Sequence, residues 1–145
     1  MAENRVILVS GNAIKQEQAL VATGPVFAGS FVMPSAGGVD LPTADYASQI
    51  AVVDFTSLDG MNSRMGDTGA NGYFNNDQIP VLYPTNGCLV NVLTIDDGIS
   101  VGDDISIDAT GLAATGGTAI GIARGDATPV PGSDTYFRVL MEVLK

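Results

Sequence analysis

The chemistry open to this chain is limited first by the side chains it lacks. There is no histidine, so neither a Ser-His-Asp nor a Cys-His nucleophile can form, and no metal can be held by imidazole. Cys88 is the single cysteine, so no intrachain disulfide can form. It lies in the apolar run Cys88-Leu89-Val90, which favours a buried, inert thiol. No glycine precedes a lysine, so a phosphate-binding P-loop is absent. We therefore predict no catalytic, metal-binding or cofactor-binding residue and no enzyme activity.

Carboxylates are the reactive groups that the chain does hold in number. It has 16 Asp and Glu against 6 Lys and Arg, a formal net charge of −10. Two carboxylates can in principle serve as acid and base, and Asp96-Asp97 and Asp103-Asp104 are adjacent pairs. Both pairs, however, stand at turn positions, where Asp is favoured because it accepts local backbone hydrogen bonds. A structural role for these carboxylates is the preferred interpretation.

Residues 57–78 form a long segment rich in Asn, Asp and Gly. Loops beyond about 15 residues without regular structure are uncommon, and they are often functional or mobile. The hard oxygen ligands that calcium prefers are present here, without the spacing of an EF-hand loop. The segment is either a calcium site or, as we favour, a solvated loop. The candidate ligands are Asp59, Asn62, Asp67, Asn71, Asn75, Asn76 and Asp77.

The charge balance restricts the partners. Nucleic-acid phosphates are bound by clustered Lys and Arg, and the sequence contains no such cluster, so we predict no nucleic-acid partner. A cationic protein surface or a divalent metal suits the acidic chain better, and solubility alone, the interpretation that we favour, explains the charge without a partner. No apolar run approaches the roughly 20 residues that span a bilayer, so no membrane partner is expected either. Residues 1–5 lack the features of a signal peptide, which predicts synthesis in a reducing cytoplasm.

The elements that would position these residues read as β-strands. The 18 glycines and 7 prolines are spread along the chain and separate short apolar runs. Asn86-Gly87 predicts a hairpin between strands at 79–83 and 88–95. About eight strands at this spacing predict a mainly β fold, a small β-barrel or a sandwich. The other strand-like runs are 26–33, 50–55, 99–108, 119–123 and 136–144.

The N-terminal part differs from the rest, which predicts two regions. Residues 1–25 form an arm or edge segment, and residues 26–145 form one β-rich domain. Residues 13–20 are compatible with one or two helical turns. The apolar run at 6–9 is either a core strand or an arm that adds to the edge of a neighbour's sheet. On the second alternative, the predicted assembly interface comprises Arg5, Val6, Ile7, Leu8 and Val9.

Two runs in the second half carry a resemblance. They are Thr94-Ile95-Asp96-Asp97-Gly98-Ile99-Ser100-Val101-Gly102-Asp103-Asp104-Ile105 and Ala119-Ile120-Gly121-Ile122-Ala123-Arg124-Gly125-Asp126-Ala127. With the C-terminal strand, they make residues 79–145 resemble the capsid decoration, or cement, proteins of tailed bacteriophages. The resemblance implies a β-barrel or β-tulip protein that binds as a homotrimer, or as another small oligomer, on the outer face of the virion capsid. There it would bridge neighbouring major capsid protein subunits and so stabilise the shell.

Two further functions stand beside this one. The first is a ligand-binding β module of a phage tail or adhesin, whose binding would depend on calcium if the segment at 57–78 holds that ion. The second is an enzyme, because residues 35–41 resemble the first motif of trimeric dUTP pyrophosphatases. The chain lacks that family's Gly-Val-Ile-Asp-type segment and its basic, Gly-rich C-terminal motif, which argues against the enzyme.

Overall fold

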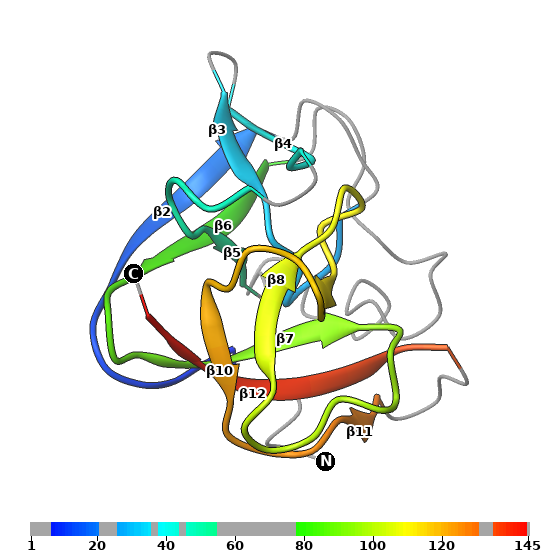
Figure 1. Ribbon diagram of the computed structural model, residues 1–145. Helices are drawn as coiled ribbons and strands as arrows, with labels where there is room; N and C mark the ends of the chain where they lie inside the picture. Colours follow the sequence, from blue (N-terminus) through cyan, green and yellow to red (C-terminus); the bar gives the residue numbers. More distant parts are fainter. Residues whose placement is uncertain are drawn as a thin grey trace.

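The protein is built from β-strands alone throughout the part of the chain that its structure describes. The computed structural model describes residues 7–20, 26–35, 38–43, 46–54, 78–130 and 135–144. Those residues contain no helix, hence none long and apolar enough to cross a membrane, and the predicted mainly β class is confirmed (Figure 1). The strands are β1 (Leu8–Ser10), β2 (Ala13–Leu20), β3 (Met33–Ser35), β4 (Gly38–Asp40), β5 (Val52–Val53), β6 (Gln78–Pro84), β7 (Leu89–Thr94), β8 (Asp104–Ile107), β9 (Ala113–Ala114), β10 (Gly121–Ala123), β11 (Thr128–Pro129) and β12 (Phe137–Val143).

The largest sheet holds seven of these strands, in the order β1-β7-β9-β8-β10-β12-β11. Strand β12 also pairs with β7, so β7, β9, β8, β10 and β12 are linked in a ring. One link of that ring is a single parallel pair, Thr94 with Ala113, whereas the other links are antiparallel. The parallel link between β7 and β9 is therefore the shortest of the ring.

The C-terminal strand, predicted as a strand-like run at 136–144, is paired with β7, β10 and β11 of this sheet. Strand β12 pairs with β7 from Phe137 opposite Thr94 to Glu142 opposite Leu89. Its alternate residues Val139, Met141 and Val143 are buried in the main core. Alternation with a period of two places the residues between them on the opposite face of the sheet.

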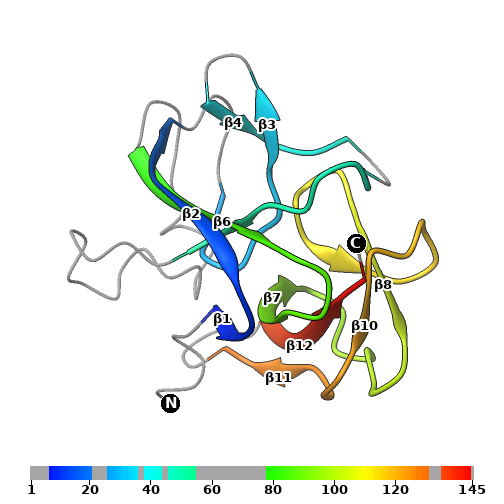
Figure 2. The same ribbon diagram turned by 90° about the vertical axis from the view of Figure 1, so that its left-hand side faces the viewer.

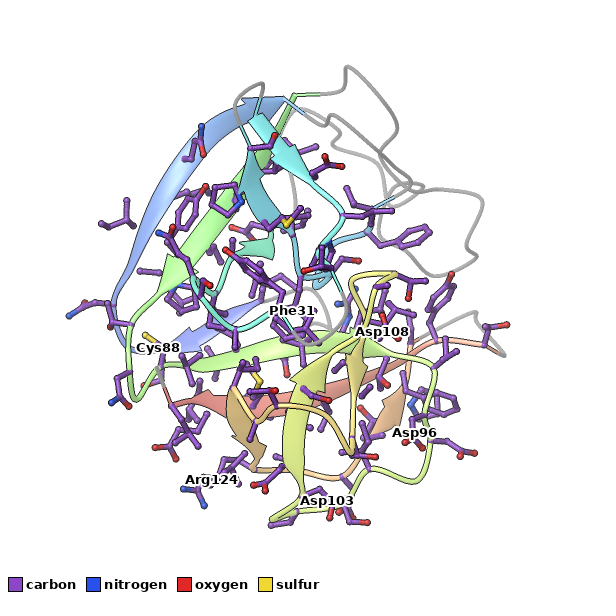
Figure 3. All side chains as sticks on the ribbon, turned by 45° about the horizontal axis from the view of Figure 1, so that its top comes forward. Phe31, Cys88, Asp96, Asp103, Asp108 and Arg124 are labelled. Atoms are coloured by element: carbon purple, nitrogen blue, oxygen red, sulfur yellow. The ribbon has the colours of Figure 1, made fainter. Side chains whose placement is uncertain are left out.

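A smaller sheet, β2-β6-β5, lies between two hydrophobic cores. Val52 and Leu82 belong to the main core, whereas Val53 and Val81 pack in a second core beneath the β3–β4 hairpin. A sheet buried on both faces needs apolar residues at consecutive positions, which explains the run at 50–53. The main core joins the two sheets, and Phe31, fully buried, lies at its centre between them (Figure 3).

The N-terminal segment pairs with both halves of the fold. Strand β1 is antiparallel to β7, and β2 is antiparallel to β6, so residues 8–20 run alongside residues 78–90 (Figure 2). The helical alternative for residues 13–20 is wrong, because this segment is the strand β2. Strands β1 and β2 each stand at an edge of their sheet.

The predicted hairpin at Asn86-Gly87 is also wrong in its pairing, although the turn itself is present. Cys88 N–H donates to the Thr85 carbonyl at 3.1 Å, and Gly87 has a φ of 90°, as the third residue of a type II turn requires. The turn passes the chain from one sheet to the other. Because residues 8–20 pair with both β6 and β7, those two strands do not pair with each other.

Candidate functional site

The two runs that carry the resemblance fold onto each other as one unit, the 94–127 unit, which comprises residues 94–105 and 119–127. Strand β8 pairs with β10, with Ile105 opposite Gly121. Beyond the strands, Gly102 N–H donates to the Ala123 carbonyl at 2.8 Å, and Ala123 N–H donates to the Asp103 carbonyl at 2.9 Å. The two runs are therefore joined by backbone hydrogen bonds along their length.

The carboxylates of this unit hold its turns. The Asp96 carboxylate accepts from Gly98 N–H at 2.9 Å, and the Asp103 carboxylate accepts from Ser100 N–H at 2.9 Å. Asp126 ties the two runs together by accepting from Val101 N–H at 3.0 Å. The turn interpretation is thus confirmed for Asp96 and Asp103. Within the described residues, no three Cys, Asp or Glu side chains gather closely enough to hold a metal ion.

An apolar groove lies beside this unit, with a cavity volume of about 410 Å³. Ligand pockets in proteins span about 300–1,000 Å³, so the groove is large enough for one side chain of a partner or a small ligand. Its most exposed apolar side chain is Ile95, at 56%. The lining residues are Phe27, Leu41, Ile95, Thr110, Leu112, Thr135 and Tyr136.

Local hydrogen bonds fix the walls of the groove. The Asp108 carboxylate accepts from Thr110 N–H at 2.9 Å, from the Thr110 hydroxyl at 2.6 Å and from Leu112 N–H at 3.0 Å. In the second wall, the neighbours of Ile95 are held in place. Asp96 N–H donates to the Thr94 hydroxyl at 3.0 Å, and that hydroxyl donates to the Ala113 carbonyl at 2.7 Å. Two separate turns therefore present Thr110, Leu112 and Ile95 in fixed positions.

The floor of the groove is aromatic. The rings of Phe27 and Tyr136 are 5.4 Å apart at a tilted angle of 47°. They cover Leu93, which is fully buried on the face of β7 that points away from the main core. Partial burial raises the pKa of the Tyr136 phenol above its ordinary value. Next to Phe27, the buried guanidinium of Arg138 donates to the Ala28 carbonyl at 2.8 Å.

The structure distributes the predicted interface residues among different environments. Arg5 and Val6 lie outside the described residues. Ile7 is 1% exposed in the main core, and Leu8 pairs with Val90 of the same chain. Only Val9, at 47%, offers an exposed apolar side chain among the described members of the set.

Other sequence predictions fall differently. All candidate calcium ligands of the segment at 57–78 lie outside the described residues. Cys88 is buried, as predicted, and its thiol donates to the Asn12 carbonyl at 2.7 Å. The groove was not predicted, because its lining comes from five separate stretches of the chain and has no common spacing. The one available signal was Ile95, an apolar residue directly before the Asp96-Asp97 turn.

Comparison with known proteins supplies no relative: no protein-family model matches the chain, and no curated protein matches it.

Proposed function

We propose that this protein is a structural assembly protein that decorates the outer face of a tailed-phage capsid and bridges neighbouring major capsid protein subunits. The observation that carries the proposal is the 94–127 unit. The two runs that resemble decoration proteins are separated by residues 106–118, and they form one hydrogen-bonded element. A resemblance spread over two unrelated surfaces would carry less weight.

The charge of the chain supports contact with a cationic protein surface. Six aspartates lie between residues 95 and 127, and Arg124 is the single basic residue in that stretch. The Arg124 side chain pairs with Glu142, so its charge is compensated within the protein. Many copies on one lattice would turn a modest contact of each copy into firm retention on the shell.

Sedimentation velocity of the purified protein, with calcium and with a chelator, tests the proposed assembly state. A homotrimer in both conditions is the expected result. A mass that changes with calcium would contradict the proposal and favour the alternative, a calcium-dependent ligand-binding module of a tail or adhesin. The groove of about 410 Å³ is the observation that favours that alternative.

The predicted interface at Arg5–Val9 needs a truncation that spares the core. Removal of residues 1–11 would also remove the buried Ile7 and the strand β1. Removal of residues 1–6 takes away Arg5 and Val6 alone among the interface residues. We expect this shorter truncation to unfold at the same urea concentration as the full chain and to bind heads more weakly. Unchanged binding would contradict a role of Arg5 and Val6 in the interface.

A further inference from the structure

We propose that the groove beside Ile95 is the docking site for a partner-protein segment that carries one aliphatic or aromatic side chain flanked by lysine or arginine. The inference rests on the proposed function for the identity of the partner, a capsid subunit. The recognition chemistry follows from three features of the groove: its apolar floor, its acidic rim and its fixed walls.

The apolar floor of the groove favours an apolar side chain of the partner. Phe27 and Tyr136 form it, Leu112 lies in the adjoining wall, and the half-exposed Ile95 stands at the edge of the groove. Hot spots of protein interfaces are formed by side chains that enter such a pocket and exclude water from it. The walls are already held by the hydrogen bonds of Asp108 and Thr94, so little order has to be created when a partner binds.

The aspartates at the rim of the groove favour a positively charged partner. Three aspartates adjoin lining residues: Asp40 precedes Leu41, Asp96 follows Ile95, and Asp108 binds the backbone of Thr110 and Leu112. Figure 3 shows Asp96 and Asp108 on the same side of the molecule. Carboxylates at the rim of an interface attract basic partners and repel acidic ones.

The described cations leave that rim acidic. Lys15 is paired with Asp54 at 3.4 Å, and Arg124 is paired with Glu142. Arg138 is 2% exposed, and its guanidinium binds the carbonyl of Ala28, the residue after the lining residue Phe27. A second copy of the chain, itself carrying a net charge of −10, is a poor occupant for the same reason.

The edges of the described sheets favour recognition by side chains over strand addition. Strand β1 has three residues and a register shift, and β11 has two residues, one of them Pro129. Strand β2 is longer, but its register shifts between Gln16 and Ala19 and it carries Lys15. Short strands, bulges, proline and lysine are the devices by which proteins prevent pairing at sheet edges.

The test is a titration followed by backbone amide NMR shifts of the full chain. The probe is an acetylated, amidated pentapeptide Gly-Lys-Phe-Lys-Gly, and the control peptides replace both lysines by glutamate or the phenylalanine by serine. We expect the lysine–phenylalanine peptide to shift the amides of residues 95, 110, 112 and 136, and each control to bind at least tenfold more weakly. Equal binding of the glutamate peptide, or shifts confined to other residues, would overturn the proposal.

A pair of matched variants tests the place of binding. Ile95→Lys puts a positive charge and a polar head on the rim, and both Ile95 and its control Val101 are exposed, at 56% and 61%. Val101→Lys makes the same charge change outside the groove. Ile95→Lys should weaken peptide binding at least tenfold and Val101→Lys less than threefold. Equal losses would show a general charge effect and overturn the site.

The same two variants separate this inference from the proposed function. If the chain binds heads and Ile95→Lys binds them as well as Val101→Lys does, the groove is not the capsid contact and the inference fails alone. If the peptide binds in the groove but no form of the chain binds heads, the proposed function fails while the recognition chemistry stands. A concentration-dependent mass that Ile95→Lys abolishes would identify a second copy as the occupant and overturn the choice of partner.

Discussion

Replacement of Gly111 by alanine should destabilise the protein by about 2–5 kcal/mol, from two costs that the structure separates. Gly111 has a φ of 83°, and a left-handed conformation costs an L-residue roughly 1–2 kcal/mol. An added Cβ would stand 2.6 Å from the Phe31 carbonyl oxygen, a backbone atom that cannot turn aside. Relief of such overpacking costs about 1–3 kcal/mol more.

The contact matters because it joins the groove to the main core. Phe31 N–H donates to the Gly111 carbonyl at 2.7 Å, so the turn that Asp108 holds is anchored on a fully buried residue of the main core. A shift of that turn away from Phe31 would also move Leu112, a wall of the groove. Gly111→Ala should therefore weaken the binding of the lysine–phenylalanine peptide as well as lower stability.

Gly116→Ala is the matched control. Gly116 has a φ of 93°, but nothing lies within 4 Å of the position of its added Cβ. It should lose only the conformational cost, about 1–2 kcal/mol. Urea unfolding followed by circular dichroism measures both, provided that the slope with urea is unchanged. Equal destabilisation of the two variants would refute the close approach of Gly111 to Phe31.

Four further perturbations test other parts of the account. Asp108 Oδ1 holds its turn with three hydrogen bonds, so Asp108→Ala should lower the free energy of unfolding in urea by about 1–2 kcal/mol. Asp108→Asn should lower it by less, because the amide oxygen still accepts. Equal losses in the two variants would contradict that role. Arg138→Met should lower the free energy of unfolding by about 1–3 kcal/mol, because it leaves the buried Ala28 carbonyl without this donor. Arg124→Ala removes an exposed ion pair and should lower it by less than about 1 kcal/mol. A larger loss from Arg124→Ala than from Arg138→Met would contradict the observed burial. Burial and the nearby Tyr46 raise the pKa of Tyr83 in the folded state, so the folded protein holds this proton more tightly than the unfolded chain does. The free energy of unfolding should therefore fall as the pH rises above about 10. Tyr83→Phe should reduce that fall in urea titrations at alkaline pH. The Cys88 thiol should react with a disulfide reagent only after unfolding, and rapid reaction of the native protein would contradict its burial.

The sequence was sufficient for the strands whose apolar residues alternate. Strands at 104–107, 121–123 and 137–143 lie within the strand-like runs predicted at 99–108, 119–123 and 136–144, because apolar residues of each pack in the main core. It was insufficient for pairing. The Asn86-Gly87 signal predicted the turn correctly, but a local turn does not determine which distant segment pairs with the flanking strands. Here the N-terminal residues 8–20 occupy that place, which a helix-compatible polar stretch did not reveal.

The candidate site was less predictable than the fold for a related reason. The turn role of Asp96 and Asp103 follows from local chemistry, and it was predicted. The groove depends on the meeting of Phe27, Leu112 and Tyr136 across more than a hundred residues, which no local pattern records. The exposure of Ile95 could not be predicted either. It follows an apolar run whose members Val92 and Leu93 are fully buried, and nothing in the sequence distinguishes Ile95 from them.

The most direct test of the central claim is co-sedimentation of the purified chain with tailed-phage heads prepared without it. We expect saturable binding, in calcium and in chelator alike, that Ile95→Lys weakens more than Val101→Lys does, together with heads that withstand more heat or chemical denaturant. Absence of saturable binding to heads, or binding that leaves their stability unchanged, would contradict the role of a capsid-stabilising protein.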